Sequence, residues 1–319
     1  MNLIEISGEE TGMRLDAFLS SCYVSLSRSY LQKLIGDGHI LVENGGKSDD
    51  SDDLTDLGEA RGKTVKNGYK LREGDRVYVT IPAETALSVE PENIPLDVVY
   101  EDGDVILVNK PKNMVVHPAA GHMSGTLVNA LLYHCRDLSG INGVLRPGIV
   151  HRIDKDTTGI VIACKNDEAH RKIAEQFAVH SNTRAYRAVV TGNVKEDEGT
   201  IDKPIGRDKK DRKKMAVDFD GKPAVTHYKV LQRFGQYTYM EFRLETGRTH
   251  QIRVHMASAG HPLLGDTVYS SGKSPFKTEG QVLHAYLLGF KHPKTGEYME
   301  FETELPEYFK TILRALENG

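Results

Sequence analysis

The segment "HRIDKDTTG", residues 151 to 159, combines residue types that can carry out chemistry within one short polar stretch. Asp154 follows Arg152 and precedes a pair of threonines and a glycine. An ionised carboxylate can attack an electrophilic carbon or stabilise a positive charge that develops beside it. A single acid in a polar turn is more commonly solvated or caps a helix. The rest of the chain has to distinguish these two interpretations.

Basic residues gather in a second segment, "KPIGRDKKDRKKM", residues 203 to 215. A loop of this composition can bind phosphate groups, and each such contact makes the affinity more sensitive to salt. The alternative interpretation is an ordinary solvated loop. The basic residues of this segment are Lys203, Arg207, Lys209, Lys210, Arg212, Lys213 and Lys214.

Acidic residues are concentrated in residues 43 to 60, which carry a net charge of −6, whereas the whole chain of 319 residues carries −4. The rest of the chain is therefore slightly basic, so the overall charge does not exclude a polyanionic partner. The acidic tract has no aromatic residue and cannot form a core of its own. It predicts a mobile surface insertion at about residues 45 to 64.

The cysteines and histidines do not form a metal-binding pattern. Cys22, Cys135 and Cys164 are far apart and form no CxxC pair, which is typical of free thiols in a reducing cytosol. The five-residue spacing of His250 and His255 corresponds to about 140° around a helix, unlike the spacing of a zinc-binding helix. We therefore expect no metal and no other cofactor.

The length of the chain is sufficient for two domains. Residues 83 to 95, with two prolines and little periodicity, predict a linker between a small domain at 1 to 82 and a larger domain at 96 to 319. No run of eighteen apolar residues and no leader-like N-terminus occurs in the sequence, which favours a cytoplasmic protein without membrane segments.

The elements that must position these residues follow from hydrophobic periodicity. Residues 13 to 35 predict two short helices, the second capped by Ser27, with Arg28, Gln32 and Lys33 on its polar face. That face is either solvated or binds a partner. The larger domain predicts strands with interspersed helices, including one helix entered through Ser124, and therefore an α+β fold around a large mixed, mostly antiparallel sheet.

Five motifs in the larger domain occur in an order that resembles the RluA-type pseudouridine synthases, in particular their RluD-like, large-subunit ribosomal subgroup. The resemblance covers nearly all of the chain outside residues 45 to 64. The N-terminal domain, "RLDAFLSSCYVSLSRSYLQKLIGDGHILVENG" with "LREGD", resembles the α/β RNA-binding domain named after the fourth small-subunit ribosomal protein. The five motifs are "DVILVNKPKNMVVHPAAGHMSGTLVNALL", "HRIDKDTTG", "RAYRAVVTG", the basic segment, and "LETGRTHQIRVHMASAGHPLLGDTVY".

The resemblance implies the pseudouridine synthase fold and the isomerisation of uridine to pseudouridine in RNA. In this reaction the carbon–nitrogen glycosidic bond breaks and the sugar is rejoined to carbon five of the same base, with no redox change. The resemblance implies that Asp154 is the reacting aspartate and that Arg248 is its charge partner. It also implies that Tyr186 stacks on the base, that Ile252 excludes water, and that Arg152 fills the place of a flipped base.

We therefore expect a monomeric, cofactor-free enzyme that modifies large-subunit ribosomal RNA. Three alternatives differ in substrate or class: a synthase acting on tRNA, a noncatalytic RNA-binding assembly factor, and a hydrolase of free nucleosides. The presence of Asp154, Tyr186 and Arg248 argues against a pure binding module, and the RNA-binding features argue against a small substrate.

Overall fold

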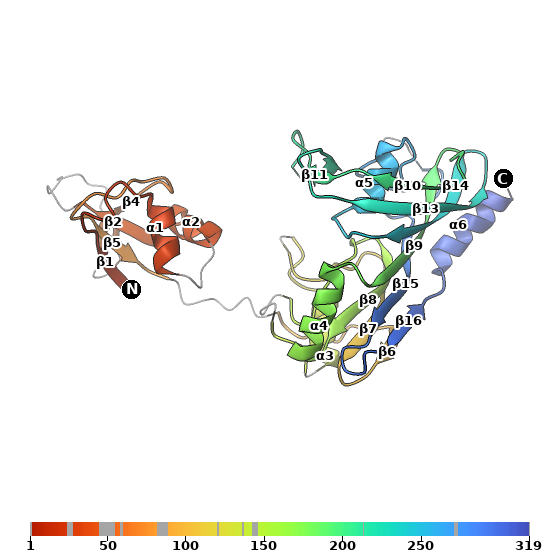
Figure 1. The fold of residues 1–319 in the computed structure, drawn as a ribbon, viewed down its shortest axis with the longest axis horizontal. Coiled ribbons are helices and arrows are strands. Elements are labelled where there is room, and N and C mark those ends of the chain that lie inside the picture. Colours follow the sequence, from red (N-terminus) through yellow and green to blue (C-terminus); the bar gives the residue numbers. More distant parts are fainter. Residues whose placement is uncertain are drawn as a thin grey trace. The chain divides into compact units, whose positions relative to one another are not determined.

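The computed structural model describes residues 2–23, 28–44, 55–57, 60–81, 89–119, 121–135, 137–141, 146–212, 214–270 and 274–318. The chain divides into two compact units, Met1–Leu87 and Ser88–Gly319 (Figure 1). The expected cap Ser27 lies outside the described residues.

The first unit is an antiparallel sheet with two helices packed on it. Leu15, Leu19, Leu31 and Ile35 form its core together with the inward-facing residues of the strands. Both expected helices are confirmed. The helices are α1 (Leu15–Cys22) and α2 (Arg28–Gly36), and the strands in sheet order are β1 (Asn2–Glu5), β5 (Arg76–Val79), β2 (Ile40–Glu43), β4 (Ala60–Thr64) and β3 (Thr55–Leu57).

The prediction of an insertion reaching residue 64 is wrong at its C-terminal end. Val42 in β2 pairs with Lys63 in β4, and Gly62 is buried against the backbone of β2. A strand can be held by its backbone hydrogen bonds even when its side chains are polar, which is why the composition of this segment was misleading. Residues 45–54 and 58–59 lie outside the described residues.

The second unit is built on a mixed sheet, and among its described strands only β15 and β8 run parallel. All other neighbouring strands are antiparallel, which confirms the expected architecture. The strands in sheet order are β10 (Glu198–Asp202), β13 (Val225–Arg233), β14 (Tyr237–Leu244), β9 (Thr183–Thr191), β15 (Leu283–Lys291), β8 (Thr158–Cys164), β7 (Val105–Lys110) and β6 (Val98–Glu101), and β16 (Tyr298–Glu302) also pairs with β15.

The two faces of this sheet carry different helices. Side chains alternate along a strand, so in β8 Val161 joins the cluster that contains α3 (Leu127–His134) and α5 (Gln251–Ser258). Its neighbour Ile162 joins a cluster on the other face, which packs against α4 (Asp167–Ala178). The C-terminal helix α6 (Glu307–Glu317) packs its Phe309 and Ile312 against β9 and neighbouring segments.

Helix α5 has no counterpart among the elements expected from the sequence. Its residues Gln251 to Met256 are all buried, so it shows no polar stripe opposite an apolar one. Amphipathic periodicity, the usual signal of a helix, is absent from such a segment. This helix carries Ile252 and Arg253, two residues of the candidate site.

Two local boundaries differ from those expected. Helix α3 is capped by Thr126 and not Ser124, because Thr126 and Asn129 form a reciprocal capping box. Residues 89 to 95, expected as part of a linker, pack on the second unit: Val89 is buried there, and Glu92 N donates to Asn129 O at 3.0 Å. In the part of the chain that the structure describes, no helix is long and apolar enough to span a membrane.

Candidate active site

Asp154 lies in a turn that is fixed from both sides. Its carbonyl oxygen accepts a hydrogen bond from Thr157 N at 3.1 Å, which closes the turn. Gln281 donates to the Thr157 hydroxyl at 3.1 Å. Gly159, the second residue of β8, has a φ of +115° and lies so close to β15 that a Cβ would collide with the backbone of Ala285. The threonine and glycine of the motif therefore position the carboxylate.

Lys110 holds the same turn through hydrogen bonds of its side chain. Its ammonium group is fully buried and donates to the carbonyl oxygens of Pro111, Met114 and Lys155 at 2.8 to 2.9 Å. Burial lowers the pKa of Lys110 to about 7. The contact with Lys155, the residue after Asp154, makes Lys110 a supporting residue that sequence reasoning did not identify.

The charge partner of Asp154 is Arg253. Nη1 of Arg253 donates to Asp154 Oδ2 at 2.8 Å. The prediction that Arg248 has this role is wrong: its Nε donates to the carbonyl oxygen of Pro223 at 2.9 Å. The two arginines occur in one motif, "GRTHQIR", so spacing alone could not distinguish them.

Gln251 explains why the two arginines diverge. Its side-chain oxygen accepts hydrogen bonds from Arg248 N and from the Thr246 hydroxyl, and its amide nitrogen donates to Val225 O and the Thr226 hydroxyl. The loop is thereby folded back against β13, and Arg253 leaves the first turn of α5 on the side of Asp154. Arg248 stays in the loop and lines the same cavity.

Asp266 holds Arg253 from the other side. Its carboxylate accepts from Arg253 Nε at 2.7 Å and from Nη2 at 3.0 Å, and it also accepts from Val268 N and Tyr269 N. Burial raises the pKa of Asp266, but the contacts with Arg253 outweigh burial and keep it below the usual value. Burial lowers the pKa of Arg253, but both aspartates together raise it. Arg253 is thus an orienting cation between two carboxylates.

His250 and Tyr269 extend this network. His250 adopts a left-handed backbone with a φ of 58°, and its Nε2 lies 3.8 Å from Asp154 Oδ1. Its Nδ1 lies 2.7 Å from the Tyr269 hydroxyl, which also accepts from Met215 N at 3.0 Å. Met215 opens β12 (Met215–Val217), so the basic segment is connected to the surroundings of Asp154. His255 does not join this network, because its two ring nitrogens contact the Thr226 hydroxyl and the Lys203 carbonyl oxygen.

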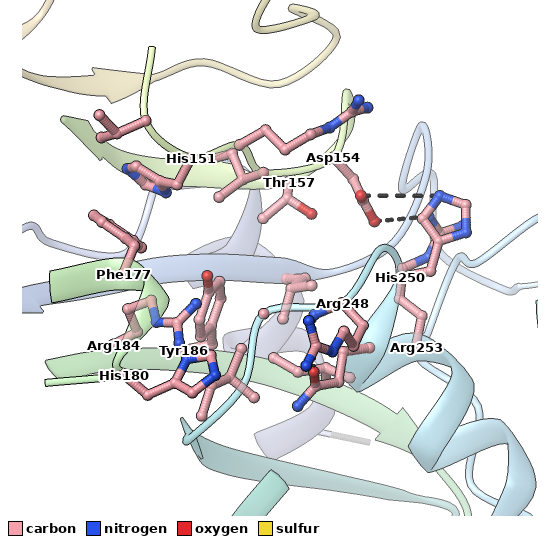
Figure 2. Close-up of a pocket in the computed structure, with 18 of the residues that line it drawn as sticks. His151, Asp154, Thr157, Phe177, His180, Arg184, Tyr186, Arg248, His250 and Arg253 are labelled. Carbon is pink, nitrogen blue, oxygen red and sulfur yellow. Dashed lines mark hydrogen bonds and ion pairs between the residues drawn. The ribbon is translucent and has the colours of Figure 1, made fainter. Parts of the chain in front are cut away.

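These residues border a cavity of about 480 Å³, a size suited to a small ligand such as one nucleotide. Figure 2 shows Asp154, His250 and Arg253 at one end of it and Phe177, His180 and Arg184 at the other, with Tyr186 between them. Ile252 also lines the cavity and is buried. Tyr186 has its pKa raised, chiefly by burial, so its hydroxyl is protonated at neutral pH. The cavity thus combines a carboxylate, an aromatic ring and several cations.

The family model described as RNA pseudouridylate synthase matches residues 104–258, which contain most of these groups. An RNA pseudouridine synthase of Bacillus subtilis is 51% identical over 100% of both chains. This chain belongs to the RNA pseudouridine synthase family. It is an enzyme that isomerises uridine to pseudouridine in RNA.

Further relatives of the synthase include a protein of Zymomonas mobilis named ribosomal large subunit pseudouridine synthase D, 44% identical over 98% of this chain and 96% of that protein. A protein of the same name from Haemophilus influenzae is 41% identical over 98% of this chain and 94% of its own. The solved human RNA pseudouridylate synthase domain containing 1 has a TM-score of 0.53 at 25% identity and covers 73% of this chain and 97% of its own.

The predicted RNA contacts of the synthase differ in their surroundings. Arg152 is exposed at the cavity, and among the described residues no carboxylate lies within ion-pairing distance of it. Lys209 is exposed but ion-paired with Asp218 and Asp220, whereas Lys210 and Arg212 are exposed without an ion pair to a described residue. Lys214 is half-buried, and Lys213 lies outside the described residues.

In the first unit of the synthase, two of the three predicted contact residues are engaged by a buried acid. Arg28 donates to Asp16 Oδ2 at 3.1 Å, and Gln32 donates to the same oxygen at 2.6 Å. Asp16 has its pKa lowered, most strongly by a hydrogen bond from Arg14. Lys33 is exposed. Arg28 and Gln32 therefore connect α2 to α1, and a role of theirs in RNA binding remains a prediction.

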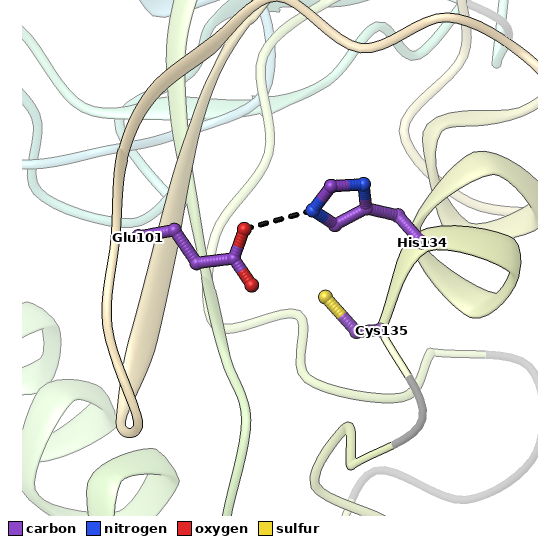
Figure 3. Close-up of side chains that lie close together, drawn as sticks. All are labelled: Glu101, His134 and Cys135. Carbon is purple, nitrogen blue, oxygen red and sulfur yellow. Dashed lines mark hydrogen bonds and ion pairs between the residues drawn. The ribbon is translucent and has the colours of Figure 1, made fainter.

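Among the residues that the structure describes, potential metal ligands meet at two places, and in both they already have protein partners. Glu101, His134 and Cys135 lie together in Figure 3, but Glu101 accepts from His134 Nε2 and from Lys165 Nζ, each at 2.8 Å. Burial raises the pKa of the Cys135 thiol to about 11, so it is protonated and a poor ligand. The second group is Asp102, Asp104 and His292, in which Asp102 accepts from His292 at 2.8 Å and from two backbone amides.

Proposed function

We propose that this synthase modifies uridines of large-subunit ribosomal RNA and that Asp154 is its reacting carboxylate. The observation that carries the assignment of Asp154 is its ion pair with Arg253 at the wall of a cavity that also contains Tyr186. The ribosomal substrate is supported by the relatives named ribosomal large subunit pseudouridine synthase D, whose similarity extends over 98% of this chain.

Asp154 has to be ionised to react. The guanidinium of Arg253 stabilises the negative charge and fixes the direction of the carboxylate, while Asp266 prevents that guanidinium from rotating away. The carboxylate then attacks the sugar or the base, or stabilises the cation that develops as the bond between C1′ and N1 breaks. The detached uracil turns within the cavity until C5 faces C1′, and the new carbon–carbon bond forms.

Tyr186 and Ile252 act on the base. The tyrosine ring offers a stacking surface. Because its hydroxyl is protonated at neutral pH, it can accept the proton from C5 only while it passes its own proton on to solvent. Ile252 contributes an apolar surface that keeps water away from the reacting carbon. Both roles require the target base to leave its helix, at a cost of roughly a few kcal/mol. Arg152, exposed at the cavity, is placed to enter the vacated space.

Binding of a long RNA involves two further regions. Lys210, Arg212 and the other basic residues between β11 (Ile205–Arg207) and β12 bind phosphates. The first unit, which resembles the domain of the fourth small-subunit ribosomal protein, contributes a second RNA-binding surface that includes Lys33. We also propose that the protein is a monomer and that it acts in the cytoplasm, where a large-subunit ribosomal RNA would be modified.

The experiment is chemical mapping of pseudouridines in RNA from cells that lack this protein. We expect specific pseudouridines to disappear from large-subunit ribosomal RNA and to return with the wild-type protein but not with Asp154→Asn. Losses confined to tRNA would reject the ribosomal substrate and retain the enzyme class. Restoration by Asp154→Asn would reject the catalytic assignment.

A further inference from the structure

Arg184 is a buried cation that the mechanism above does not use. It lies in β9 two residues before Tyr186, so both side chains emerge on the same face of the strand, and both line the cavity. Only 8% of Arg184 is exposed. Nη2 donates to the carbonyl oxygen of Glu245 at 3.3 Å, and Nε has no hydrogen-bond partner. Among the described residues, no carboxylate lies within ion-pairing distance of this guanidinium.

Two other side chains with nitrogen donors line the same cavity, the guanidinium of Arg248 and the imidazole of His180. Burial and, to a smaller extent, Arg248 lower the pKa of Arg184. Burial first, and then both arginines, lower the pKa of His180. Figure 2 shows His180 and Arg184 on one side of Tyr186 and Arg248 on the other. The chain brings Arg248 towards Arg184, because Gly247, the residue before Arg248, lies against Nη1 of Arg184. Asp154, the acid of the cavity, is engaged by Arg253 at the opposite end. Among the described residues, no carboxylate forms an ion pair with Arg184 or Arg248, although Glu245 lies near enough to raise the pKa of His180.

The chain is shaped to keep Arg184 in this place. A Cβ on Gly247 would collide with Nη1 of Arg184, whereas the glycine allows the guanidinium to lie against the backbone. The ring of Phe177 lies 5.6 Å from the guanidinium carbon and covers it. If Arg184 had only a structural role, its Nε would remain without a hydrogen-bond partner and its charge without a counter-ion. Both are unfavourable for a buried side chain.

We propose that Arg184, together with Arg248 and His180, forms a phosphate subsite that binds the phosphodiester attached to the target uridine. This inference rests on the proposed function for its substrate, an RNA. The phosphodiester is the anionic group of RNA, and two guanidiniums that have no ion pair with a described carboxylate favour an anion over a neutral uracil carbonyl. Binding this group anchors the flipped nucleotide while its base is free to detach and turn beside Tyr186.

The neighbouring surface supports this assignment. Gly247 and Arg248 also line a second cavity of about 460 Å³, which contains Arg207 and Lys222. The backbone of an RNA chain that leaves the phosphate subsite therefore meets further cations along the same wall.

The first test compares nucleotides that differ only in the phosphate. Uridine, uridine 3′-monophosphate and uridine 5′-monophosphate are titrated against the full-length protein and followed by NMR. We expect one of the monophosphates to bind wild type at least about tenfold more tightly than uridine, since a charged hydrogen bond is stronger than a neutral one. Arg184→Gln should abolish this preference and Arg184→Lys should retain part of it. Equal binding of all three probes by wild type, or an undiminished preference in Arg184→Gln, would overturn the subsite.

Gly247→Ala provides a second variant that retains the charge but displaces the guanidinium, and it carries the test if Arg184→Gln does not fold. Arg314→Gln, on the exposed surface of α6, is the matched control and should keep the preference. On a transcribed ribosomal RNA, the dependence of log(kcat/KM) on log salt should become shallower by about one in Arg184→Gln and stay unchanged in the control. An unchanged slope in Arg184→Gln would also overturn the proposal.

The proposed phosphate subsite and the proposed ribosomal substrate are rejected by different experimental results. If the pseudouridines prove to lie in tRNA, the preference for the monophosphate and its loss in Arg184→Gln are still expected, because both RNAs have the same backbone. If ribosomal RNA is the substrate but the preference is absent, only the subsite is rejected.

Discussion

Arg253 donates to Asp154 at 2.8 Å although 99 positions separate the two residues in the sequence. The pair joins the turn before β8 to the first turn of α5, and the side chain of Asp154 is 18% exposed whereas that of Arg253 is 6% exposed. The carboxylate therefore faces the cavity while its partner is fixed behind it. This arrangement leads to the following predictions.

Asp154→Asn should abolish pseudouridine formation. Asparagine retains the size and much of the hydrogen bonding of aspartate but has no negative charge, so it can neither attack nor stabilise a cation. The variant should fold and bind RNA with nearly wild-type affinity, as measured by filter binding alongside an assay for pseudouridine. Activity close to that of wild type would return this turn to a structural role.

Arg253→Ala and Arg248→Ala should affect different kinetic constants, the first mainly kcat and the second mainly KM. Loss of Arg253 leaves Asp154 and Asp266 without their shared cation, so kcat should fall by at least about a hundredfold. Loss of Arg248 removes a cation from the cavity wall, so KM for RNA should rise while kcat at saturation changes little. Steady-state kinetics on one RNA separate the two effects. A larger loss of kcat in Arg248→Ala than in Arg253→Ala would contradict the ion-pair assignment.

Asp266→Asn should lower kcat by about tenfold or more, because Arg253 is then free to turn away from Asp154, and small displacements of reacting groups are costly. Asparagine can still accept from Val268 N and Tyr269 N, so the loop should remain folded. Combining Asp266→Asn with Asp154→Asn should add no further loss in turnover, because residues that act as one unit are not additive. The control is RNA affinity, which should be unchanged in both single variants.

Tyr186→Phe and Tyr186→Ala separate stacking from proton transfer. The phenylalanine variant retains stacking, worth about 1–3 kcal/mol per base, and should bind RNA normally but turn over more slowly. The alanine variant should lose affinity as well. If both variants lose affinity and turnover equally, the ring acts only in packing, since Tyr186 belongs to the core cluster of the sheet.

The stability of the protein should fall with decreasing pH from about 6.5 towards 4, in part because of His284. Burial lowers the pKa of this fully buried histidine to about 4, so it remains neutral in the folded state while the unfolded chain takes up a proton. Each such histidine contributes a slope of at most about 1.4 kcal/mol per pH unit to the free energy of unfolding. In urea denaturation between pH 4.5 and 6.5, His284→Gln should have a shallower slope than wild type. An identical slope would show that His284 is accessible to protons in the folded state.

The sequence by itself determined the elements and motifs whose signals are local. The continuous apolar runs of β7 and β8 and the amphipathic patterns of α4 and α6 predict strands and helices without reference to the rest of the chain. The motif around Asp154 has its own turn-forming residues, Thr157 and Gly159, so the place of the carboxylate could be predicted. The order of the motifs was sufficient to predict the family.

Only the tertiary structure decided which groups surround that carboxylate. Helix α5 is buried on all sides and has no amphipathic signal, so the sequence does not reveal that position 253 faces Asp154 while position 248 faces Pro223. Asp266, Lys110 and Arg184 come from separate segments, and their contacts depend on how the strands associate. The sequence did not predict strand β4 for a related reason: its side chains are polar, and it is held by backbone pairing with β2. Direction and pairing between distant segments are set by packing and hydrogen bonds across the whole unit, and no local pattern of residues encodes them.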